Sequence, residues 1–235
     1  MVITEIFKSI QGEGTRAGLP CIFVRLTGCN LRCTWCDTEY AFHGGTRISP
    51  EEILEKVAEL AGGKLPADAP IRKVPAGISL VELTGGEPLL QKETPLLAEK
   101  LLAEGYTVMI ETSGERFVGV LPPGVIKIVD VKCPDSGAAD TFDTANLEVI
   151  GQNDEIKFVI ATRRDYDFAL DFTTRHRLAE RVHEVLLSPV FADPAGRWPE
   201  LSPRSLVEWM LQDGIPARLG MQIHKFIWDP ATKGV

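Results

Sequence analysis

Short apolar runs alternate with amphipathic segments along most of this chain. The apolar runs are rich in Val, Ile and Leu, a composition typical of buried strands. Between them, apolar residues recur three and four positions apart, the spacing of one helix face. Ser49-Pro50-Glu51-Glu52 has the pattern of a capping box and predicts the start of one of these helices. The predicted strands cover residues 21–26, 78–83, 107–110, 126–131, 156–160, 182–187 and 219–223, and the predicted helices cover residues 50–60, 92–103, 164–172 and 203–211.

The alternation predicts an α/β fold. Strands separated by helices favour a parallel sheet with right-handed crossovers, and near-continuous apolar strands fit a sheet covered on both faces. We expect a partial (β/α) barrel of about six parallel strands. It forms a single domain over residues 1–235, with an N-terminal binding segment and a C-terminal extension. The Gly, Pro and Ala content of residues 62–77 indicates a surface loop, and the pattern does not assign residues 137–150.

Polar residues follow the predicted strands where each one ends. In parallel α/β folds the chemistry gathers at the C-terminal ends of the strands. Polar groups on five such ends therefore predict one shared site at this edge. The segments concerned are the cysteine-containing loop 27–40, Thr84-Gly85-Gly86-Glu87-Pro88, Glu111-Thr112-Ser113-Gly114, Asp130-Val131-Lys132 and Ser188-Pro189.

Composition and charge narrow the function only slightly. The 235 residues are 44% hydrophobic and 25% charged, as in an ordinary globular protein. A net charge of −8 argues against non-specific nucleic-acid binding. No apolar run approaches the roughly 20 residues that span a bilayer, and residues 1–7 lack the pattern of a secretory leader. We therefore expect a cytoplasmic protein with reduced cysteines and no membrane partner.

Three cysteines, Cys29, Cys33 and Cys36, lie on one short loop at C-x3-C-x2-C spacing. Three thiolates can hold three irons of a [4Fe–4S] cluster and leave the fourth iron free for a small molecule. A zinc site with His43 as a fourth ligand is an open alternative. Cys21 and Cys133 are isolated, and the sequence assigns them no role.

The cysteine spacing together with Gly85-Gly86-Glu87-Pro88 resembles the radical S-adenosylmethionine (SAM) superfamily. Three motifs, two of which contain these residues, together resemble the 7-carboxy-7-deazaguanine synthase family within it. The resemblance is strong over residues 5–114 and moderate over residues 130–134. Residues 222–228 also look like the C-terminal segment of that family, and residues 137–181 match it only in the alternation of strands and helices. The motifs are SIQGEG (9–14), FVRLTGCNLRCTWCDT (23–38) and TGGEP (84–88).

The resemblance implies an activity, its cofactors and its site residues. The activity is conversion of 6-carboxy-5,6,7,8-tetrahydropterin to 7-carboxy-7-deazaguanine with loss of ammonia, in queuosine and 7-deazapurine biosynthesis. The cofactors are a [4Fe–4S] cluster, SAM and Mg²⁺, and the partners are an electron donor such as flavodoxin and a second copy of the chain. The implied substrate contacts are Ile10, Gln11, Gly12, Glu13, Arg25 and Thr84; the SAM contacts are Trp35, Asp37, Gly86, Glu87, Ser113, Asp130, Val131, Lys132 and Ser188; the cluster ligands are Cys29, Cys33 and Cys36; and the Mg²⁺ ligand is Thr38.

The chemistry of several of these residues fits such roles but does not require them. The amide of Gln11 and the carboxylate of Glu13 suit the edge of a pterin-like ring, and the planar fork of Arg25 suits a carboxylate. Each strand-end polar residue could instead cap a helix. His224 could move a proton or be a buried structural histidine.

Two other functions stay open on the sequence. One is an activating enzyme that installs a glycyl radical on a partner protein, and the other is a non-enzymatic zinc or iron–sulfur module. Turnover of the carboxylated pterin distinguishes the first from the synthase, and anaerobic reconstitution with iron and sulfide distinguishes the second.

Overall fold

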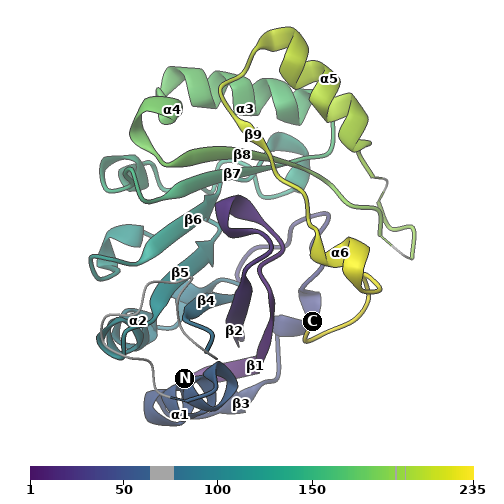
Figure 1. Cartoon of the computed structure of the whole chain (residues 1–235). Helices are drawn as coiled ribbons and strands as arrows, with labels where there is room; N and C mark the ends of the chain where they lie inside the picture. The colour runs from purple at the N-terminus through teal and green to yellow at the C-terminus, as the bar shows by residue number, and fades with distance from the viewer. Residues whose placement is uncertain (64–76, 194, 199) are drawn as a thin grey trace.

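The fold is one nine-stranded sheet with helices on its outer side (Figure 1). The computed structural model describes residues 1–63, 77–193, 195–198 and 200–235. The predicted loop 62–77 lies almost entirely outside the described residues. The strands are β1 (Val2–Ile10), β2 (Pro20–Leu26), β3 (Thr46–Arg47), β4 (Leu80–Gly85), β5 (Thr107–Thr112), β6 (Ile126–Asp130), β7 (Glu155–Ile160), β8 (Glu184–Pro189) and β9 (Arg218–Leu219).

The strand order is β3-β1-β2-β4-β5-β6-β7-β8-β9. From β2 to β9 every neighbouring pair is parallel, whereas β1 pairs antiparallel with both β2 and β3. In the described part of the chain β3 and β9 are edge strands that do not pair with each other, so the barrel is partial. The predicted fold class is thus confirmed.

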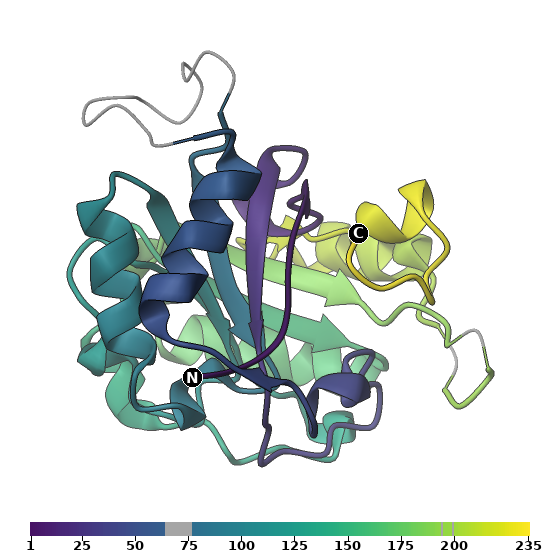
Figure 2. The same ribbon diagram turned by 90° about the horizontal axis from the view of Figure 1, so that it is seen from below.

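Six α-helices accompany the sheet in the described residues, and four of them are long enough to cover its outer face (Figures 1 and 2). The predicted capping box at Ser49 is present: the Ser49 hydroxyl accepts from the Glu52 amide at 3.2 Å, and the Glu52 carboxylate accepts from the Ser49 amide at 2.7 Å. No helix in the described residues is long and apolar enough to cross a membrane. The helices are α1 (Pro50–Ala61), α2 (Thr94–Ala103), α3 (Arg163–Arg175), α4 (Leu178–Arg181), α5 (Pro203–Asp213) and α6 (His224–Ile227).

The inner face of the sheet changes from apolar to polar along the strands. Near the N-terminal ends, Cys21, Phe23, Leu80, Met109 and Ile126 belong to one buried apolar cluster. Because side chains alternate between the two faces of a strand, the inward positions that follow along β4, β5 and β6 are Glu82, Glu111 and Asp130. Cys21 is therefore a core residue, and the polar half of the inner face lies at the C-terminal ends of the strands.

Three parts of the structure differ from the predictions. Residues 2–10 form β1, which the sequence did not predict because apolar and polar residues do not alternate clearly along it. The predicted strand 219–223 is wrong beyond Leu219, since the chain leaves the sheet there and the amide of Ile223 donates to Gly12 O at 3.0 Å. The unassigned residues 137–150 contain a short 3-10 helix, Thr144–Glu148.

Candidate active site at the C-terminal ends of the strands

The cysteine loop follows β2 and is fastened to two neighbouring segments. The amide of Thr34 donates to Ser136 O at 2.7 Å, and the amide of Glu87 donates to Gly28 O at 2.8 Å. Cys29, Cys33 and Cys36 are all free thiols of intermediate exposure. The loop therefore presents three thiols at the mouth of the partial barrel.

The donor set of this loop fits an iron–sulfur cluster. Burial raises the pKa of the Cys36 thiol to about 11, so binding of a metal must displace its proton. Within the described residues, no three His, Cys, Asp or Glu side chains yet converge closely enough to hold an ion. Cluster binding would have to draw the thiols of Cys29, Cys33 and Cys36 together, which a short loop with half-exposed side chains allows.

Gly86 lies directly against the cysteine loop. A Cβ atom at this position would be 2.3 Å from Gly28 O and 2.6 Å from the Cβ of Cys29, distances that no side chain tolerates. The position therefore admits only glycine while the loop stays in place. This contact joins the Gly-Gly-Glu-Pro turn to the loop that carries the predicted cluster ligands.

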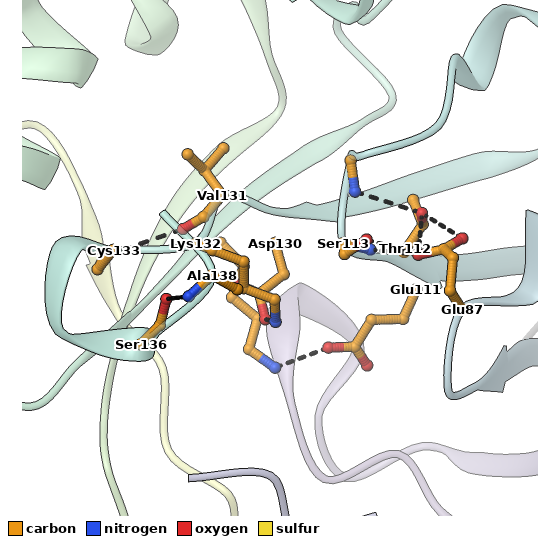
Figure 3. Close-up of polar contacts among 12 residues, drawn as sticks. Glu87, Glu111, Thr112, Ser113, Asp130, Val131, Lys132, Cys133, Ser136 and Ala138 are labelled. Atoms are coloured by element: carbon orange, nitrogen blue, oxygen red, sulfur yellow. Dashed lines mark hydrogen bonds and ion pairs between the residues drawn. The ribbon is translucent and has the colours of Figure 1, made fainter. Parts of the chain in front are cut away.

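The Glu87 carboxylate joins the ends of β4 and β5 (Figure 3). Its side chain is completely buried and accepts hydrogen bonds from the Thr112 hydroxyl at 2.8 Å, the Ser113 amide at 2.8 Å and the Ser113 hydroxyl at 2.7 Å. It also accepts from the Leu89 amide at 3.0 Å. These bonds give Glu87 a role in fixing the turn, while SAM contacts by Glu87 and Ser113 stay predictions.

The ends of β6 and β8 carry the remaining predicted SAM residues. Lys132 donates to Asp130 at 2.6 Å, and this carboxylate holds the pKa of Lys132 above its usual value although burial alone would lower it. The other oxygen of Asp130 is buried without a partner in the described residues, so an acceptor is available for a ligand. Val131 and Ser188 are buried at the same strand ends, and Trp35 is partly exposed in the cysteine loop.

The SIQGEG segment turns from β1 into the interior of the sheet. The buried amide of Gln11 donates to Glu82. Glu13 forms an ion pair with Lys157 and accepts from the Gln222 side chain at 2.8 Å. A small cavity between this segment and the strands is lined by Gln11, Glu13, Glu82, Glu111 and Lys157, among others.

The carboxylates around this cavity have strongly displaced pKa values. Burial would raise the pKa of Glu13, but the nearby ammonium of Lys157 lowers it to about 2. Burial raises the pKa of Glu82 well above its usual value, and the charges of Glu111 and Glu13 raise it further. Burial also raises the pKa of Glu111, against the opposing effect of Lys157. The cavity thus holds one firmly ionised carboxylate, Glu13, and two whose pKa burial raises, of which Glu111 is paired with the ammonium of Lys157.

Arg25 and Thr84 are neighbours in the register of β2 and β4. The Nε of Arg25 donates to Glu5 at 2.8 Å, and Glu5 also accepts from the Tyr40 hydroxyl at 2.8 Å. No hydrogen bond within the described residues engages the two terminal nitrogens of Arg25. Its planar fork is thus held at Nε and keeps two donors for a ligand.

The C-terminal segment Gln222–Lys225 packs across the SIQGEG turn and the exit of the cysteine loop, and it passes beside the β1–β2 hairpin in Figure 1. Lys225 donates to Asp37 at 2.6 Å. The imidazole of His224 lies against Gly12, where a Cβ atom would be 1.9 Å from its Nδ1. Burial lowers the pKa of His224. Thr38, the predicted Mg²⁺ ligand, follows Asp37 in the chain, and its hydroxyl donates to the Asp37 carboxylate at 2.9 Å.

Sequence reasoning missed four residues that build this site: Glu82, Lys157, Gln222 and Lys225. A signal existed for the first two. Each is a charged residue inside an otherwise apolar strand, and such a residue is buried only with a partner. The resemblance over residues 222–228 marked the segment of Gln222 and Lys225 but gave neither residue a role, because their partners Glu13 and Asp37 are distant along the chain.

Comparisons with known proteins agree with this geometry. Residues 23–129 match the radical SAM superfamily. A 7-carboxy-7-deazaguanine synthase of Koribacter versatilis is 50% identical and covers 100% of both chains. One of Chlorobaculum tepidum is 39% identical over 99% of this chain and 96% of the relative.

Solved structures show the same arrangement. The crystal structure of QueE from Escherichia coli has a TM-score of 0.68 and 25% identity, and covers 94% of this chain and 92% of its own. A structure of TYW1 with a lysine–pyruvate adduct has a TM-score of 0.56 at 13% identity, covers 82% of this chain and 72% of its own, and supports the fold alone. With 50% identity to such a synthase over its whole length and a match to the superfamily over residues 23–129, the chain belongs to the 7-carboxy-7-deazaguanine synthase family of the radical SAM superfamily.

Proposed function

We propose that this chain converts 6-carboxy-5,6,7,8-tetrahydropterin to 7-carboxy-7-deazaguanine with loss of ammonia, a ring contraction in the biosynthesis of queuosine and other 7-deazapurines. One observation carries the proposal. The SIQGEG segment enters the inner face of the sheet, and there it places Gln11 and Glu13 on the cavity. The relatives that match this chain along its whole length bear the name of that activity.

The side chains around the cavity suit the two ends of this substrate. Its aminopyrimidinone edge presents an exocyclic amine beside a ring N–H, a pair of donors that the ionised carboxylate of Glu13 can accept. Its carboxylate needs a planar pair of donors, which the terminal nitrogens of Arg25 provide. Glu13 of the SIQGEG segment would thus bind one end of the substrate, and Arg25 of β2 would bind the other.

The cofactors would bind at the C-terminal ends of the strands. Cys29, Cys33 and Cys36 would hold the [4Fe–4S] cluster, and the unpartnered oxygen of Asp130 is an acceptor for SAM. When bound, the cluster and SAM supply the radical that removes a hydrogen atom from the substrate. The residues of this chain orient the substrate, and segment Gln222–Lys225 covers the site and excludes water. His224, whose pKa is lowered by burial, is neutral at neutral pH and able to accept a proton.

Four further features belong to the same proposal. Thr38 would be a Mg²⁺ ligand, with the substrate carboxylate and waters completing the coordination, because a single hydroxyl is a modest ligand for a hard cation. A flavodoxin-type donor would reduce the cluster. The chain would act as a homodimer in the cytosol. The relatives reported above do not favour a glycyl-radical activating enzyme.

Anaerobic reconstitution tests the proposed function directly. The protein is loaded with iron and sulfide, then incubated with SAM, dithionite and 6-carboxy-5,6,7,8-tetrahydropterin. We expect a product with the mass of 7-carboxy-7-deazaguanine and release of ammonia. Cleavage of SAM without any change in the pterin would contradict the substrate assignment, and zinc uptake without iron would contradict the radical chemistry.

Replacing Arg25 by Ala should weaken substrate binding selectively. Loss of a charge-assisted pair of hydrogen bonds costs about 1.5 to 3 kcal/mol, which corresponds to a KM raised about tenfold or more. Uncoupled SAM cleavage should persist, because Arg25 lies on β2 and is neither a predicted cluster ligand nor a predicted SAM contact. Arg47→Ala, which removes an exposed arginine on β3, is the matched control. An unchanged KM in the Arg25 variant would mean that this arginine serves only its ion pair with Glu5.

A further inference from the structure

Lys157 is a buried cation at the centre of the carboxylate cluster in the cavity. It comes from β7, its side chain is 6% exposed, and its ammonium contacts two carboxylates at once. One is Glu13 of the SIQGEG turn, and the other is Glu111 at the end of β5, with an Nζ–Oε1 distance of 2.7 Å. A single ammonium therefore joins the N-terminal segment to the sheet.

The N-terminal segment does not depend on Lys157 alone for its attachment to the sheet. The SIQGEG segment has two other anchors on the inner face, because Gln11 donates to Glu82 and Thr15 and Arg16 donate to Glu155. Removing Lys157 would leave both of those anchors in place. What it would take away is the counter-charge between Glu13 and Glu111, which no other contact replaces in the described residues.

We propose that Lys157 is a positioning residue that holds the carboxylates of Glu13 and Glu111 together as paired acceptors for N–H groups of the substrate. The inference rests on the proposed function, since it names what that site does with a donor-rich pterin. Two carboxylates that face one cavity repel each other, and at least one becomes protonated unless a cation lies between them. A protonated carboxyl offers an O–H donor where the substrate also offers a donor.

The other charged groups around Lys157 do not substitute for it. The carboxylates of Glu82 and Asp130 add to the negative charge that it balances. The guanidinium of Arg25 is paired with Glu5, and the ammonium of Lys132 is paired with Asp130. The charged and titratable groups around Lys157 and its two carboxylates come from several elements. They are Glu13 and Arg16 from the N-terminal segment, Arg25 from β2, Asp37 from the loop exit, Glu82 from β4, Glu111 from β5, Asp130 and Lys132 from the end of β6, Glu155 from β7, and His224 and Lys225 from the C-terminal segment.

The sign of the expected pH effect follows from this charge balance. With Lys157 present, the pKa of Glu13 lies far below neutrality, so its ionisation does not limit binding at neutral pH. Without Lys157, burial and mutual repulsion raise the pKa of Glu13, and the pKa of Glu111, which burial already raises, goes up further. Substrate binding should then be weak at neutral pH and recover as pH rises, because the carboxyls lose their protons.

The test compares Lys157→Met, Lys157→Arg and Lys127→Met in reconstituted enzyme, over roughly pH 6 to 9, where a carboxyl of raised pKa titrates. Lys127 is the matched control, a partly buried lysine on β6 that is paired with Asp154 outside the cavity. For Lys157→Met we expect a KM for the pterin raised about tenfold or more at neutral pH, a smaller change in kcat, and recovery of KM toward alkaline pH. Lys157→Arg should restore most of the affinity, and Lys127→Met should change stability alone.

SAM cleavage without substrate and turnover of the pterin are measured on the same variants, so that a failure of this inference can be told from a failure of the proposed function. All variants should cleave SAM with dithionite in the absence of substrate. If Lys157→Met turns over the pterin with the KM and pH profile of the unsubstituted enzyme, Lys157 is structural and the inference fails while the proposed function stands. If the unsubstituted enzyme leaves the pterin unchanged, both fall. Should the methionine variant not fold, Lys157→Gln removes the same charge and should show the same pH profile.

Discussion

Replacing Cys33 by Ala should abolish cluster assembly and SAM cleavage together. Two thiolates cannot hold three irons of a [4Fe–4S] cluster, and cleavage of SAM depends on the cluster for its electron. Iron and sulfide analysis after anaerobic reconstitution should fall from about four irons per chain to a small fraction of that. Formation of 5′-deoxyadenosine should disappear in the same samples.

Cys21→Ala is the matched control for this loss. Cys21 undergoes the same chemical change but is buried in the apolar cluster of the inner face, away from the loop. The Cys21→Ala variant should lose some free energy of unfolding, because the missing sulfur leaves a small cavity, but it should still bind iron and cleave SAM. A Cys33→Ala protein that keeps its four-iron content would contradict the ligand assignment.

Replacing Glu87 by Ala should destabilise the chain strongly even without cofactors. The change removes the acceptor for the amides of Leu89 and Ser113 and for the hydroxyls of Thr112 and Ser113. Leaving buried donors unpaired costs about 1 to 3 kcal/mol each, so we expect a loss of about 3 kcal/mol in the free energy of unfolding. Urea unfolding of the cofactor-free protein measures it.

The control for this prediction lies only a few residues away. Glu93 immediately precedes α2, is exposed and makes no capping hydrogen bond with its side chain, so Glu93→Ala should change stability by less than about 0.5 kcal/mol. Because Glu87 fixes the turn that touches the cysteine loop, its variant should also bind SAM more weakly. A Glu87→Ala protein that unfolds at the same urea concentration as the unsubstituted chain would show that other contacts hold this turn.

The sequence by itself determined the parallel part of the fold and the chemistry that lies on one loop. Apolar runs separated by amphipathic helices identified the central strands, because burial on both faces leaves a local pattern. The spacing of Cys29, Cys33 and Cys36 and the glycines of Gly85-Gly86-Glu87-Pro88 are also local. The capping box at Ser49 was predicted for the same reason: both partners lie within one turn of helix.

Only the tertiary structure decided how distant segments complete the site. Glu87 is a predicted SAM contact, and the fold shows in addition that its carboxylate accepts hydrogen bonds from Thr112 and Ser113. Lys157 and Glu13 are far apart in the chain and meet because β1 turns the SIQGEG segment into the sheet. Such ion pairs and hydrogen bonds join residues on different elements, so no periodicity or motif records them. They depend on the burial that folding creates, and that same burial sets which carboxylates of the cavity are ionised.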